Sequence, residues 1–144
     1  MNTFLPYPDF QKSAQCLDYK RLGKQRCEAW QVYLALTKEN YGWKNHPCIR
    51  MWRGYEIALA FYCMAICNEW ISRGYKDTIK VKICEKLGID FPEAYSKEHN
   101  IIYPKWLGNE DFHASHRSNL LRKDPEWYGK FGWKEPNNLP YIWG

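Results

Sequence analysis

Apolar residues recur at helical spacing along much of the chain, and no stretch shows the strict alternation of a half-buried strand. The clearest stripe belongs to a predicted helix over about 48–72 and comprises Tyr55, Leu59, Tyr62, Cys63, Ile66 and Trp70. Gly74, just past the end of this helix, is typical of a C-terminal cap. The pattern therefore predicts a long, partly buried helix in the middle of the chain.

A second long helix is expected nearer the N-terminus, after a segment over 1–9 whose two prolines disfavour helix. It begins near Phe10 to Ser13, with Ser13 as a candidate cap, and runs to about 36. Its rough apolar face is formed by Ala14, Leu17, Trp30, Tyr33 and Leu36. Gly23 weakens this helix by roughly 1 kcal/mol relative to alanine, which indicates close packing or the approach of a ligand at that position.

Two shorter helices are predicted over about 78–87 and 110–123. The segments 37–48 and 88–108 are expected to be connections, and the tail after 124, with three prolines, to be irregular and rich in aromatic contacts. These elements predict an all-α protein with one compact domain over residues 1–144. It has three main helices, additional short helices and an irregular aromatic tail.

Composition narrows the functional classes. A net charge of +5 permits an anionic partner. Because no secretory signal precedes them, the six cysteines are expected to be reduced thiols, with Cys63 and Cys67 packed in the core. Mean hydropathy is −0.68, and the longest apolar run is too short to span a bilayer. We therefore expect no membrane role, and a location in the cytoplasm, on the nucleoid, or in a host cell if the protein is viral.

Charged and polar residues share one face of the first long helix. Arg21 is followed at helical spacing by Lys24 or Gln25 and then by Glu28. A carboxylate beside two cations suits acid–base chemistry, or stabilisation of an iminium ion, near a phosphate backbone. An exposed ladder of ion pairs is the alternative.

Three histidines are candidates for chemistry. His46 precedes a helix, where it can contact a phosphate, transfer protons or simply bond to the backbone. His113, His116 and Arg117 share one face of the predicted helix over 110–123. Arginine in this cluster opposes a metal cation, so an anion site suits the charges better, with helix packing as the alternative. We expect no metal and no cofactor.

The stretch 113–134 combines five Lys or Arg with four aromatic residues. Cations hold phosphates and flat rings stack on bases, so this combination indicates a nucleic-acid surface. Candidates for base or backbone contact are Trp127, Tyr128, Lys130 and Phe131. Packing of the tail on the core is the alternative.

The motifs of nucleotide hydrolysis, hydride transfer, common hydrolases and zinc proteases are absent. Three ordered blocks instead resemble the pyrimidine-dimer DNA glycosylase family. They read CLDYKRLGKQR from Cys16, MWRGYE…EWISRGYKDT from Met51, and SHR…PEWYGKFG from Ser115, whereas 77–108 matches poorly. The resemblance implies a compact all-α fold with three main helices.

The resemblance also implies a mechanism. The N-terminal amine attacks C1′ of a damaged nucleotide and displaces the base, and β-elimination of the resulting Schiff base cuts the strand. A glutamate of the first helix stabilises the cationic intermediate, the DNA is kinked, and a base is flipped out. Residues and resemblance together suggest these DNA contacts: Lys20, Arg21, Lys24, Gln25, Arg26, His113, Arg117, Trp127, Tyr128, Lys130 and Phe131.

The chain departs from the family pattern at two places. Arg21 occupies the position of the family's glutamate, so Glu28 is the candidate replacement and Asp18 a second choice. The family's nucleophile is a threonine amine exposed by removal of Met, whereas the second residue here is too large for efficient removal in general. The candidate catalytic residues are therefore Met1, Asn2, Thr3, Glu28, Arg21, His46 and His116.

We therefore expect a monomeric glycosylase and abasic-site lyase acting on damaged or modified double-stranded DNA, with pyrimidine dimers as the first candidate. Loss of the expected glutamate favours a second hypothesis, a non-catalytic relative that binds distorted DNA. A glycosylase for another modified base is a third. RNA is a further possible partner, but the chain contains nothing that resembles an RNA-recognition signature.

Overall fold

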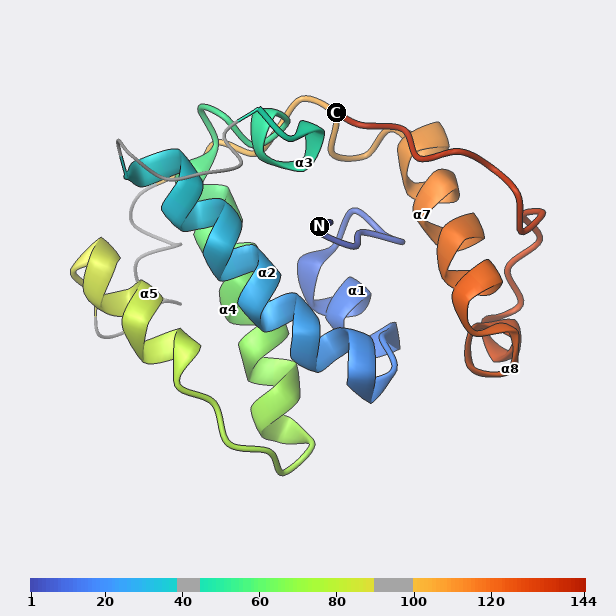
Figure 1. The fold of residues 1–144 in the computed structure, drawn as a ribbon, viewed down its shortest axis with the longest axis horizontal. Coiled ribbons are helices and arrows are strands. Elements are labelled where there is room, and N and C mark those ends of the chain that lie inside the picture. The colour runs from blue at the N-terminus through green and yellow to red at the C-terminus, as the bar shows by residue number, and fades with distance from the viewer. Residues whose placement is uncertain (39–44, 90–99) are drawn as a thin grey trace.

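The computed structural model describes residues 1–38, 45–89 and 100–144, and all regular secondary structure in these ranges is helical (Figure 1). This confirms the all-α prediction. The predicted connections over 37–48 and 88–108 lie partly outside the described residues. The helices are α1 (Phe10–Cys16), α2 (Tyr19–Thr37), α3 (Pro47–Arg50), α4 (Glu56–Ser72), α5 (Ile79–Leu87), α7 (Glu110–Lys123), α8 (Pro125–Tyr128) and the 3-10 helix η1 (Gly129–Phe131).

Helices α2 and α4 cross at the centre of the molecule, with α5 on one side and α7 and α8 on the other (Figure 1). The predicted stripe on α4 is confirmed, because Leu59, Tyr62 and Cys63 are fully buried. Gly23 on α2 faces Trp70 near the end of α4: a Cβ atom there would be 2.9 Å from the ring of Trp70. This glycine therefore serves close helix packing.

The first long helix is in fact two helices. The backbone is extended at Leu17 and Asp18, and the Asp18 carboxylate accepts from the Arg21 N–H at the start of α2. The prediction that Ser13 caps the first helix is wrong. Asp9 caps α1, whereas Ser13 is buried and donates its hydroxyl to the Tyr7 carbonyl.

The predicted helix over 48–72 is also divided. A turn separates α3 from α4, and Gly54 in this turn has a φ of 88°, which favours glycine. Met51 and Trp52 are buried in the turn itself. The apolar pattern therefore continues across the break, and this continuity conceals it in the sequence. The tail expected to be irregular begins with α8 and η1.

The N-terminal segment, residues 2–7, runs through the middle of the fold, between α2 and α7 (Figure 1). The side chain of Gln25 on α2 accepts from the Phe4 N–H and donates to the Asn2 carbonyl, at 2.9 and 2.6 Å. On the α4 side, the Tyr62 hydroxyl donates to the Phe4 carbonyl at 2.7 Å. The segment is thus fixed by side chains, and its first residues are held beside α2.

None of the helices in the described part of the chain has both the length and the apolar character that a bilayer span requires. All six cysteines have free thiols, and Cys63 and Cys67 are buried as predicted.

Candidate functional site: a basic pocket around the N-terminal segment

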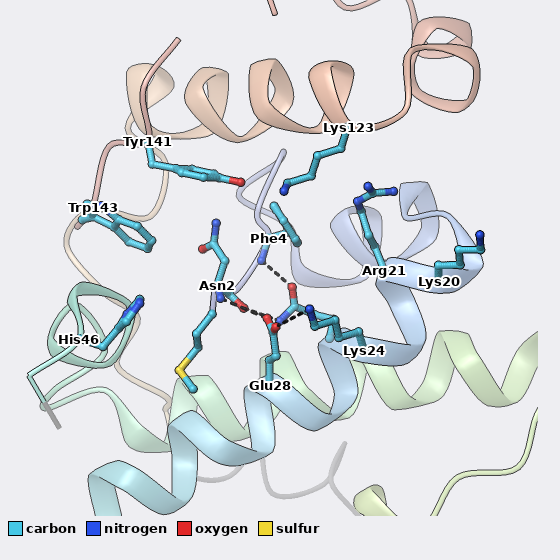
Figure 2. Close-up of a pocket in the computed structure, with 12 residues that line it drawn as sticks. Asn2, Phe4, Lys20, Arg21, Lys24, Glu28, His46, Lys123, Tyr141 and Trp143 are labelled. Carbon is cyan, nitrogen blue, oxygen red and sulfur yellow. Dashed lines mark hydrogen bonds and ion pairs between the residues drawn. The ribbon is translucent and has the colours of Figure 1, made fainter. Parts of the chain in front are cut away.

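A cavity of about 450 Å³ opens where the N-terminal segment, α2, the end of α7 and the C-terminal tail meet (Figure 2). We call it the basic pocket. It is lined by Met1, Asn2, Phe4, Lys20, Arg21, Lys24, Gln25, Glu28, His46, Lys123, Tyr141 and Trp143. The predicted face of α2 and the loop histidine are therefore brought together around the first residues of the chain.

Glu28 lies at the base of the basic pocket, and among the described residues it is the sole carboxylate in the lining (Figure 2). One carboxylate oxygen accepts from the backbone N–H of Asn2 at 3.1 Å, and the other lies 3.7 Å from Nζ of Lys24. Its side chain is only 16% exposed. The carboxylate is thus held against the N-terminal end of the chain, as an acid–base group for that position must be.

Cations surround the opening, and they are Lys20, Arg21, Lys24 and Lys123. Arg21 is anchored by Asp18, with Nη1 3.2 Å from the carboxylate. Burial, followed by the positive charges of Arg21, Arg122 and Lys24, lowers the pKa of Lys123. Such crowding of like charges is relieved when an anion binds, so the opening suits a phosphate group.

His46 lies on the opposite wall, at the N-terminus of α3. Its Nδ1 accepts from the Cys48 N–H at 3.0 Å, so the neutral ring carries its proton on Nε2. Burial, with the nearby N-terminal charge, lowers the pKa of His46. The ring therefore stays neutral at physiological pH and can donate a hydrogen bond from Nε2.

The candidate nucleophiles differ in access. Met1 and Asn2 line the basic pocket, whereas Thr3 is fully buried and its hydroxyl accepts from Nε1 of Trp52 at 2.9 Å. The Asn2 side chain is buried and acts on Tyr141, because burial raises the pKa of Tyr141 and the Asn2 amide opposes that shift. Figure 2 shows this amide directed toward Tyr141.

The two α7 histidines lie outside the basic pocket and are fully buried. Nδ1 of His116 accepts from the Leu5 N–H at 2.9 Å, and Nδ1 of His113 lies 2.7 Å from the Leu5 carbonyl. The geometry favours the helix-packing alternative for both residues. It does not favour the expected DNA contact of His113 or the expected catalytic role of His116. Their role is to hold the N-terminal segment against α7.

Arg117 and Arg26 are likewise engaged within the fold. Arg117 is paired with Glu110 and Glu135 and donates to the Pro6 carbonyl at 2.8 Å. Burial opposes its charge, but the hydrogen bonds that it donates to the two glutamates, together with their negative charges, outweigh burial and raise its pKa. Arg26 bonds to Asp77 at 2.5 Å and so connects α2 to the start of α5. Neither guanidinium faces the basic pocket, unlike Arg21.

The aromatic block of the tail mainly packs on the core. Tyr128 is fully buried and donates to the Asp18 carboxylate at 2.5 Å, which favours the packing alternative for this residue. Trp127 donates from Nε1 to the Cys16 carbonyl at 2.8 Å, and Nζ of Lys130 lies 3.3 Å from the centre of its ring. Lys130 is exposed and Phe131 partly so. Contact of DNA with these two stays a prediction.

Four pocket residues were not predicted from the sequence: Phe4 of the N-terminal segment, and Lys123, Tyr141 and Trp143. Lys123 belongs to the basic stretch 113–134, and its place at the end of α7 was the available signal. Tyr141 and Trp143 lie in an irregular tail without periodicity, so only the fold places them at the pocket.

Fold and site together define a small helical protein whose basic pocket suits a polyanion. A family model described as pyrimidine dimer DNA glycosylase matches residues 1–83, more than half of the 144-residue chain. The chain belongs to this family, which supports a role in DNA repair with DNA as substrate. No curated protein and no solved structure gives a significant match.

Proposed function

We propose that the protein is a DNA N-glycosylase and abasic-site lyase that uses an N-terminal amine as nucleophile and Glu28 as its carboxylate. The observation that carries the proposal is the 3.1 Å contact between the Asn2 nitrogen and Glu28 at the base of a basic pocket. Family membership supports damaged double-stranded DNA, first of all a pyrimidine dimer, as the substrate.

The position of Glu28 compensates for a departure from the family pattern. Arg21 stands where the resemblance places the family's glutamate, and an arginine cannot accept a proton. Glu28, two turns further along α2, brings a carboxylate to the same pocket, while Arg21 remains at the opening. Arg21 thus serves as a phosphate contact, together with Lys24 and Lys123.

The reaction needs a neutral amine near a sugar. The amine nitrogen attacks C1′, the glycosidic bond breaks, and the base leaves with the bonding electrons and takes up a proton. Glu28 accepts the proton that the amine loses and returns it to the sugar ring oxygen as the ring opens, so the carboxylate is charged again and stabilises the iminium ion formed in that step. Removal of a C2′ proton then expels the 3′ phosphate by β-elimination, and hydrolysis of the iminium ion releases the enzyme.

In this proposal the amine belongs to Asn2 where Met1 is removed, a step that the size of Asn2 disfavours, and to Met1 where it is retained. The Asn2 nitrogen already contacts Glu28, whereas Thr3 is buried and its nitrogen donates to the Asn2 side chain at 2.8 Å. Retention of Met1 places the amine one residue further out, still at the basic pocket. The mass of the N-terminal peptide from a trapped adduct distinguishes the two.

Borohydride trapping tests the function. The wild-type protein is incubated with duplexes carrying one cyclobutane dimer, one abasic site or no lesion, and products are separated on a denaturing gel. We expect a covalent adduct and strand cleavage on both damaged duplexes. Glu28→Gln should abolish turnover and spare binding, while Glu85→Gln, an exposed carboxylate on α5, is the matched control. Absence of any wild-type adduct, with binding retained, would leave the non-catalytic binder.

A further inference from the structure

Asn2 is held through its nitrogen, its carbonyl and its side chain. The nitrogen donates to the Glu28 carboxylate at 3.1 Å (Figure 2), and the carbonyl accepts from Nε2 of Gln25 at 2.6 Å. The side-chain oxygen accepts from the Thr3 N–H at 2.8 Å. Rotation about the backbone bonds of Asn2 would break at least one of these contacts, so the orientation of its nitrogen is fixed.

Gln25 contacts the N-terminal segment as a neighbouring strand would. Its Nε2 donates to the Asn2 carbonyl, and its Oε1 accepts from the Phe4 N–H at 2.9 Å. In a parallel ladder, one residue bonds in this way to the two residues that flank the one opposite it. The glutamine side chain thus replaces a strand partner, and it fixes both the position and the direction of the segment.

Gln25 and Glu28 lie three positions apart on α2, so they share one face of the helix. Because both belong to one helix, the distance between the Asn2 nitrogen and its proton acceptor is set by the geometry of α2. Gln25 is only 1% exposed, and both polar atoms of its amide bond within the fold. This does not favour the DNA contact expected for Gln25 from the sequence.

We propose that Gln25 is a positioning residue, whose amide holds the N-terminal amine beside Glu28 in the orientation that attack on C1′ requires. This inference rests on the proposed function. Reaction needs the attacking atom at about 3–3.5 Å from its target, and a misplacement of about 1 Å costs roughly 100-fold in rate. Where Met1 is retained, its amine is attached directly to the residue that Gln25 holds, so the same side chain positions either amine.

Gln25→Met tests this role, because methionine is unbranched, of similar length, and only a weak hydrogen-bond acceptor. Adduct formation is followed by borohydride trapping in a single turnover with saturating abasic duplex, and the dissociation constant for the same duplex is measured separately. The rate of adduct formation should fall about 100-fold. The dissociation constant should be unchanged, because the buried amide bonds to the protein itself.

Two controls separate positioning from general damage to the fold. Gln31→Met makes the same exchange at an exposed position of α2 and should keep the wild-type rate. Asp77→Asn removes the partner of Arg26 and so lowers stability without altering the lining of the basic pocket, and it should also keep the wild-type rate. Gln25→Asn retains the amide on a shorter side chain that cannot span both backbone groups, and it replaces the methionine variant if that variant does not fold.

The outcomes distinguish this inference from the proposed function. A folded Gln25 variant that forms the adduct at the wild-type rate, or whose only change is weaker duplex binding, would overturn the inference and leave the proposed function intact. Absence of a wild-type adduct on the abasic duplex would overturn the proposed function and the inference with it.

Discussion

Protonation of His116 should destabilise the folded protein below neutral pH. The imidazole is fully buried among the rings of Phe4, Phe112 and Tyr141, and its Nδ1 must remain unprotonated to accept from the Leu5 N–H. Burial, with a smaller effect of His113, lowers its pKa to about 3. In the unfolded chain the same group titrates near its ordinary value of 6.5.

The direction follows from proton binding. Below pH 6.5 the unfolded chain takes up a proton that folded His116 refuses, so acid favours unfolding until the pH reaches the folded pKa of about 3. The stabilisation that neutral His116 contributes to the folded protein is complete above pH 6.5 and decreases as the pH falls below that value. With these two pKa values, the free energy of unfolding falls by about 2 kcal/mol between pH 7 and pH 5 on account of this residue alone.

Urea denaturation at pH 7, 6 and 5 measures this loss in the wild-type protein and in His116→Gln, whose amide oxygen retains an acceptor for the Leu5 N–H. The variant should lose about 2 kcal/mol less than the wild type over this interval. The imidazole C–H resonances of His116 should also keep their neutral position down to about pH 4, one unit above the folded pKa of about 3. Equal pH dependence of the two proteins would refute the reasoning.

Three further substitutions probe the scaffold and the pocket. Gly23→Ala should lower stability by about 1–3 kcal/mol in urea denaturation, despite better helix propensity, because the new Cβ meets the ring of Trp70. Asp77→Asn should cost about 1.5–3 kcal/mol in the same assay, because Arg26 loses its charged partner. Lys123→Gln should weaken duplex binding and reduce its salt slope by roughly 0.9 for each phosphate that the protein no longer neutralises; an unchanged slope would remove Lys123 from the interface.

The helices were predictable because their buried residues follow the helical period. The candidate site was predictable in part for the same reason. Arg21, Lys24 and Glu28 are about one helical turn apart, so they share one face of α2, and this face lines the basic pocket. The helix breaks were not predictable from apolar spacing. α1 ends with Leu17 as its C-cap, and Asp18 then begins α2 by accepting from the Arg21 N–H, a hydrogen bond that periodicity does not report.

Polar residues on α7 show a second limit of prediction from the sequence. A histidine that packs against a backbone and a histidine that contacts DNA have the same sequence signature, so His116 was assigned to the site although it is fully buried. Conversely, the hydroxyl of Ser118 and the amide of Asn119 gave no signal, yet they position the tail. Partners so far apart along the chain are defined by the tertiary fold alone.

The central position of the N-terminal segment bears on how the protein is made. Leu5 bonds to His116, which lies 111 positions later in the chain, and to His113, which lies 108 positions later. On the ribosome, the segment that ends beside Glu28 is therefore synthesised long before the helix that holds it. The hydrogen bonds of Leu5 can form only after α7 has emerged, so an incomplete chain does not yet present the complete candidate site to DNA.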